Sequence, residues 1–198
     1  MKLLILLFLI SSSLFSFTIN ESLLKIHATL VPKLYLMDYK FQDKLKENTI
    51  SIALVYNENE YHDARDLQRM INSRYKNGIK TYKVKAILVT YKKISSINAN
   101  VYYLFPANKK EVQHVISKAN LNNALTFAYL KDDLKYGVMI SLNISKKIKP
   151  LLNLEAIKRH NIALRPVLID ISTIYLKASQ SKEFLKIRSF YNSDIRRA

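Results

Sequence analysis

Basic side chains that could bind an anion are concentrated in one stretch of the chain. Lys146 and Lys147 lie in a short polar connection, and Arg159 and Arg165 follow after one more apolar run. Ammonium and guanidinium groups bind carboxylate and phosphate oxygens strongly. The stretch therefore predicts that Lys146, Lys147, Arg159 and Arg165 are ligand-binding residues for a small anion. A solvated hairpin turn followed by the solvent-facing side of a helix would have the same composition, and this alternative stays open.

A second polar group, formed by Glu58, Glu60, His62 and Asp63, could in principle hold a cation. Carboxylates and imidazoles are ligands of hard and borderline metal ions. Acidic residues at the start of a helix also interact favourably with the helix dipole, and this simpler interpretation is favoured. The four histidines of the chain lie far apart and form no two-histidine metal motif. We therefore expect no metal site and no cofactor.

Most residues that catalytic motifs require are missing. The chain has two glycines, Gly78 and Gly137, and no cysteine. Phosphate-binding loops and nucleophile elbows need closely spaced glycines, whereas thiolate nucleophiles, disulfides and zinc–thiolate sites need cysteine. A hydrolase would need facing carboxylates, for which only residues 58–63 and the pair Asp132 and Asp133 are candidates. We therefore predict that the protein is not an enzyme and has no catalytic residues.

Residues 1–17 have the pattern of a signal peptide. Lys2 is followed by an apolar run over residues 3–10, and serines precede a plausible cleavage point near Phe17. Cleavage there predicts export to the bacterial periplasm. An uncleaved membrane anchor is the alternative, although the run is short for a membrane span.

The net charge of +17 is high for a chain of 198 residues. In a cytoplasmic protein it would suggest a nucleic-acid partner. Export argues against nucleic acid and favours attraction to anionic membrane or envelope surfaces. The basic tail, residues 179–198, is expected to be a frayed helix rather than an interaction arm.

Strands and helices alternate through the first two thirds of the chain. Runs of branched apolar residues predict strands, and apolar residues at helical spacing predict the helices between them. Strands are expected at residues 50–56, 81–89, 99–104, 124–128, 138–143 and 148–152, and helices around residues 20–34, 67–75, 112–119, 154–159 and 166–175. This alternation predicts an α/β fold, a mixed, largely parallel sheet flanked by helices on both faces, in a single domain over residues 18–178.

Some positions can be assigned more closely. The strand at 50–56 is almost wholly apolar and is expected inside the sheet, whereas 81–86 alternates in polarity as an edge strand does. Pro32 is expected to bend or end the first helix, and Asn153 to cap the helix at 154–159.

One set of positions between residue 121 and residue 175 forms a recognisable pattern. Its positions are residues 125–127, 137–140, Asn153, Ala156, Ile162 and 167–169. They resemble the C-terminal signature of the YfiR-like periplasmic proteins, which has a leucine–threonine strand, a glycine pair before a strand, an asparagine-led helix and a leucine pair in the last helix. The chain departs from the family pattern in having one glycine in place of two, Asp170 and Ile171 in place of small residues, and no cysteine for redox control.

The resemblance implies a function that composition and periodicity do not. It implies a periplasmic α/β protein, with a homodimer as a further expectation, that binds the periplasmic part of an inner-membrane signalling protein such as a diguanylate cyclase and restrains it. We therefore expect a non-enzymatic periplasmic regulator or sensor, with interface residues among exposed aromatics such as Tyr102 and Tyr129. The alternative is a periplasmic solute-binding protein for a small anionic ligand.

Overall fold

The computed structural model describes residues 19–160 and 162–176. The predicted signal peptide, residues 1–17, and the predicted basic tail, residues 179–198, lie outside these residues. Within them, none of the helices combines the length and the apolar character that a membrane span requires.

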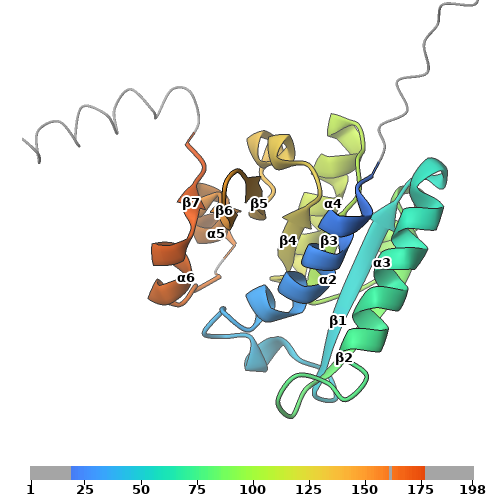
Figure 1. Cartoon of the computed structure of the whole chain (residues 1–198), viewed down its shortest axis with the longest axis horizontal. Helices are drawn as coiled ribbons and strands as arrows, with labels where there is room; N and C mark the ends of the chain where they lie inside the picture. The colour runs from blue at the N-terminus through green and yellow to red at the C-terminus, as the bar shows by residue number, and fades with distance from the viewer. Residues whose placement is uncertain (1–18, 161, 177–198) are drawn as a thin grey trace, which may run out of the picture.

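The core of the fold is a seven-stranded sheet with the order β2-β1-β3-β4-β5-β6-β7 (Figure 1). Neighbouring strands run parallel except β5 and β6, which form an antiparallel hairpin. The strands are β1 (Thr49–Tyr56), β2 (Lys83–Thr90), β3 (Val101–Leu104), β4 (Leu125–Ala128), β5 (Ile140–Ile144), β6 (Ile148–Leu152) and β7 (Thr173–Ile174). The predicted mixed, largely parallel sheet is therefore confirmed.

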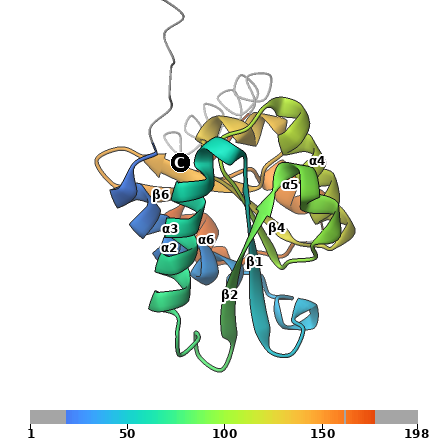
Figure 2. The same cartoon turned by 90° about the vertical axis from the view of Figure 1, so that its right-hand side faces the viewer.

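Helices cover both faces of the sheet, as predicted (Figure 2). On one face, Ile52 and Leu54 of β1 belong to the same buried cluster as residues of α2 and α3; on the other, Ala53 and Val55 cluster with residues of α4. The α-helices are α2 (Glu21–Tyr35), α3 (Tyr61–Arg74), α4 (Lys109–Leu121), α5 (Leu154–Arg159) and α6 (Pro166–Ile171). Short 3-10 helices occupy Gln42–Lys44, Glu58–Glu60, Tyr91–Ser96 and Lys131–Tyr136.

Several local expectations hold in the structure. β1 lies between β2 and β3, and β2 forms one edge of the sheet. The Asn153 side-chain oxygen accepts a hydrogen bond from the Ala156 amide at 3.1 Å and so caps α5, and its amide group donates to the Leu134 carbonyl at 2.9 Å.

Pro32 does not end α2, which continues to Tyr35 because the residues around the proline are buried against the sheet.

The last predicted helix is too long. We expected helical structure as far as Tyr175, but α6 ends at Ile171 and Ser172 has the extended angles φ −94° and ψ 162°. Residues 173 and 174 instead pair with Leu151 and Leu152 of β6. The neighbouring strand supplies hydrogen-bond partners that a helical Thr173 and Ile174 would not reach, so pairing overrides the apolar spacing.

Candidate functional site

Helix α6 lies at one end of the molecule, beside β6 and β7 (Figure 1). Most of its apolar side chains are exposed. Val167 is 57% exposed and Ile171 is 55% exposed, and Ile169 is also exposed. Only Leu168 is buried, so one side chain anchors the helix. Val167 and Ile171 are four positions apart and share a helix face. We call the exposed face formed by Val167 and Ile171 the α6 surface; Ile169, two positions from each of them, lies on another side of the helix.

Apolar residues at helical spacing predicted this helix, but of Val167, Leu168 and Ile171 only Leu168 packs into the core. A signal for the exposed surface was present in the sequence. Four of the six residues of α6 are large and aliphatic, which is more than one buried stripe requires.

Strand β7 lies next to the α6 surface and forms the second edge of the sheet. It pairs with β6 on one side only among the described residues. The opposite edge, β2, carries the exposed lysines Lys83 and Lys85, and charges of this kind prevent edge-to-edge association. β7 consists of Thr173 and Ile174 and has no charge. The β7 edge is therefore open to association in a way that the β2 edge is not.

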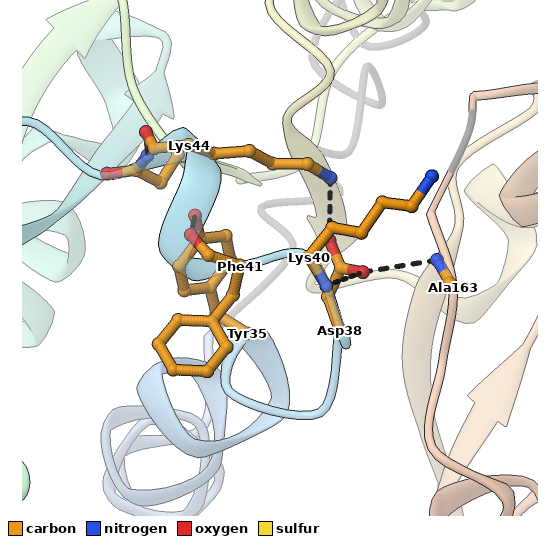
Figure 3. A network of polar contacts seen from close by, with 7 residues as sticks. Tyr35, Asp38, Lys40, Phe41, Lys44 and Ala163 are labelled. Carbon is orange, nitrogen blue, oxygen red and sulfur yellow. Dashed lines mark hydrogen bonds and ion pairs between the residues drawn. The ribbon is translucent and has the colours of Figure 1, made fainter.

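The buried side chain of Asp38 forms an ion pair with Lys44 and also binds the segment that leads into α6 (Figure 3). Asp38 is 2% exposed and accepts a hydrogen bond from the Lys44 ammonium at 2.6 Å. Its other carboxylate oxygen accepts from the amides of Lys40 and Ala163, both at 3.1 Å. Because Ala163 precedes α6, this carboxylate connects the loop after α2 to the C-terminal part of the domain.

The backbone reinforces this connection. The Tyr39 amide donates to the Ala163 carbonyl at 2.8 Å, and the Arg165 amide donates to the Met37 carbonyl at 2.8 Å. The Arg165 guanidinium lies 4.8 Å from the centre of the Tyr39 ring. We call the contacts of residues 37–39 with residues 163–165, together with the ion pair of Asp38 and Lys44, the Asp38 junction. Nothing in the local sequence distinguished Asp38 from the other polar residues of its loop.

The four residues predicted to bind an anion lie at opposite ends of β6. Lys146 and Lys147 are exposed in the turn before this strand. Arg159 ends α5 and Arg165 precedes α6, so both follow the strand. Five residues of strand span roughly 15 Å, and Arg159 is already paired with Glu155 at 2.7 Å. Anion binding by these residues stays a prediction. Their arrangement does not favour one small anion bound by all four side chains.

The acidic group at residues 58–63 lies where the helix-dipole interpretation placed it. Glu58 and Glu60 form a 3-10 turn that leads into α3, and Asp63 is in the first turn of this helix. Desolvation raises the pKa of both Glu60 and Asp63. Among the described residues, no three His, Asp or Glu side chains are arranged to hold a metal ion.

Asp132 and Asp133 do not form a facing pair. Asp132 is exposed and Asp133 is buried. Desolvation raises the pKa of Asp133 to about 6, with Lys135 acting against this shift. The aromatic residues suggested for an interface are also placed differently from expectation, because Tyr102 and Tyr129 are both buried in the two cores.

A buried histidine in the core escaped the sequence interpretation. His27 of α2 is fully buried, with its ring edge-on to Tyr103, Phe127 and Tyr129. Its Nδ1 atom and the Tyr103 hydroxyl are hydrogen-bonded at 2.6 Å, and its Nε2 atom has no hydrogen-bond partner among the described residues. Desolvation lowers the pKa of His27 to about 3. The imidazole is therefore neutral throughout the range in which proteins normally function.

Comparison with known proteins decides the family. A model of the YfiR/HmsC-like family matches residues 40–173, which include every strand from β1 to β6 and the whole of α6. The chain belongs to the YfiR/HmsC-like family. The resemblance inferred from the sequence is therefore confirmed. In this YfiR/HmsC-like protein, the α6 surface lies within the part of the chain that defines the family.

Two solved structures are similar to this YfiR/HmsC-like protein in fold. A crystal structure of a conserved domain protein from Vibrio cholerae has 13% sequence identity and a TM-score of 0.55, with 76% of this chain and 59% of that chain covered. The ABC domain in complex with L-Trp from Streptococcus pneumoniae has 9% identity and a TM-score of 0.52, with 77% and 62% covered. The chain thus spans about three fifths of each of these proteins. Identities this low show the fold alone. No curated protein matches the sequence.

Proposed function

We propose that this YfiR/HmsC-like protein is a non-enzymatic regulator that acts in the periplasm by binding the periplasmic part of an inner-membrane signalling protein, such as a diguanylate cyclase. Membership of the family supports a regulatory role. The observation that carries the proposal is the α6 surface, where apolar side chains lie exposed together on a chain with a net charge of +17. Exposed apolar groups that lie together are typical of protein-binding surfaces.

The surroundings of the α6 surface suit a protein partner. The uncharged β7 edge offers backbone groups to which an extended segment could add as a further strand. The Asp38 junction holds the segment before α6 in place, so the surface is formed before the partner arrives. A second copy of this chain is the competing occupant of the same surface.

In-cell cross-linking of the tagged full-length protein tests the proposal. The unmodified protein is expected to capture an inner-membrane protein with a periplasmic domain. The double substitution Val167→Asp and Ile171→Asp places two charges in the centre of the α6 surface. Because central interface residues each contribute about 2 kcal/mol or more, capture should fall at least about tenfold.

Leu121→Asp is the matched control. Leu121 ends α4 and is 83% exposed, so this change also introduces an acidic residue in place of an exposed aliphatic one, but away from α6. Capture should be unchanged. Undiminished capture by the double variant would mean that the partner binds elsewhere. Recovery of only the protein itself would argue for a homodimer and against the regulator.

A further inference from the structure

A small cavity opens at the amino-terminal ends of three parallel strands, β1, β3 and β4. It has a volume of about 130 Å³. Its polar lining consists of Lys44, Lys46, Ser51, Asn98, Asn100 and Asn122. The polar lining residues are thus two lysines, a serine and three asparagines, and no acidic residue is among them.

Asn100 makes the floor of this cavity rigid. Its side-chain oxygen accepts hydrogen bonds from the Ser51 amide and the Ser51 hydroxyl, both at 2.8 Å. Its side-chain nitrogen donates to the Lys44 carbonyl at 2.7 Å. Its own carbonyl accepts from the Leu125 amide at 2.9 Å, which connects β3 to β4. The cavity is therefore built by buried or half-buried groups whose positions are fixed before any ligand binds.

Two side chains of the lining, those of Lys46 and Asn98, have no role in this framework. Two others are engaged elsewhere: the Lys44 ammonium pairs with Asp38 at 2.6 Å, and Asn122 donates to the Tyr102 hydroxyl and the Lys118 carbonyl. The side chains of Lys46 and Asn98 form no hydrogen bond or ion pair with another described residue. Because both residues line the cavity, the Lys46 ammonium and the Asn98 side-chain amide are the donors available to a ligand there.

We propose that this cavity binds a small oxyanion, with Lys46 and Asn98 as its donors. The volume corresponds to about four water molecules, which matches a species of the size of phosphate or acetate. Ammonium and amide N–H groups are the donors that such oxygens accept. The site differs from the anion site predicted at Lys146 and Lys147, and it does not depend on the proposed partner.

Thermal unfolding of the purified full-length chain in added phosphate tests this site. Because any salt weakens repulsion within a chain of charge +17, phosphate is compared with chloride at equal ionic strength. At ten times the dissociation constant, phosphate should raise Tm by about 3–6 °C more than chloride, and above that concentration the rise should grow with the logarithm of the phosphate concentration. Acetate in a parallel titration shows whether a planar oxyanion also binds.

Variants distinguish the cavity from general charge screening. Lys46→Gln and Asn98→Ala change exposed side chains, so both variants should fold. Each should reduce the rise in Tm in phosphate, beyond that in chloride, to less than about 1 °C. Lys85→Gln removes one exposed positive charge from β2, outside the cavity, and should keep the full rise. The proposal is overturned if neither anion exceeds chloride, or if Lys46→Gln responds as strongly as the unmodified protein.

Discussion

Replacing Asp38 with alanine is expected to lower the free energy of unfolding by about 3–5 kcal/mol. The change removes the acceptor of two backbone amides, those of Lys40 and Ala163. It also leaves the Lys44 ammonium, whose side chain is only 14% exposed, without its carboxylate partner. Breaking a buried pair from one side is costly because the remaining charge stays poorly solvated. Urea unfolding followed by circular dichroism measures the loss.

Asp66→Ala is the matched control for this prediction. Asp66 forms an ion pair with Arg69 on α3, but both side chains are well exposed. An exposed pair of this kind contributes at most about 1 kcal/mol, so the unfolding midpoint should change little. Asp38→Asn should lie between the two, because its amide oxygen can still accept a backbone hydrogen bond. Equal losses for Asp38→Ala and Asp66→Ala would show that the junction adds nothing to stability.

Asp38→Ala should also act on function through α6. The amides of Tyr39 and Arg165 are hydrogen-bonded across the junction, so hydrogen exchange at both should speed up in the variant. A looser approach to α6 would reduce partner capture in the cross-linking experiment even at temperatures where the variant stays folded. Slow exchange at these amides in the variant would mean that the backbone contacts hold the segment without Asp38.

The second large effect is a loss of stability in acid that depends on His27. The pKa of this histidine is about 3 in the folded protein and near 6.5 in the unfolded chain. Between these values the unfolded chain binds a proton that the folded protein does not, so lowering the pH favours unfolding. By pH 4.5 this contribution reaches about 2–3 kcal/mol, and it fades as the pH rises above 6.5.

Asp133 opposes His27 in part of this range. Its pKa is raised to about 6 in the folded protein, so the folded protein binds the proton first and gains stability as the pH falls below that value. For the unmodified protein, the slope of the free energy of unfolding against pH is therefore a difference between the contributions of His27 and Asp133. A comparison of variants separates them.

His27→Gln removes the titrating group and keeps a polar side chain of similar length. The variant should be less stable than the unmodified protein at pH 7, because it loses the ring contacts with Tyr103 and Phe127. This deficit should shrink by about 2–3 kcal/mol by pH 4.5, since only the unmodified protein is penalised by protonation. Urea unfolding at several pH values measures the deficit directly.

His62→Gln provides the control for the acid effect. His62 is exposed in the first turn of α3, and its replacement should leave the pH dependence parallel to that of the unmodified protein. A deficit of His27→Gln that stays constant between pH 7 and pH 4.5 would contradict the assignment.

The α/β class, the order of most elements and the family could be predicted from the sequence because they depend on local patterns. The apolar run of β1 needs cover on both faces whatever its neighbours are. Asn153 caps α5 through an amide three positions away, a contact that lies within the local chain. The same applies to Lys83 and Lys85, whose alternation with apolar residues marked β2 as an edge.

The candidate sites depend on contacts between distant parts of the chain, and no local pattern predicts these. Asp38 meets Ala163, and His27 meets Tyr103 and Phe127, only after the sheet has assembled. Tyr102 is buried because β3 lies in the middle of the sheet, which a tyrosine in an apolar run does not reveal.

Residues 166–175 show the same difference between what local patterns predict and what contacts between distant residues decide. Helical spacing in residues 166–175 is a local property, and it correctly predicted a helix that begins at Pro166. Whether Val167 and Ile171 face the core, and whether Thr173 and Ile174 continue the helix or pair with β6, depends on where β6 lies. Local periodicity determined which elements form, and tertiary structure alone decided which of their faces stay exposed, because burial is a property of the neighbours that packing brings together.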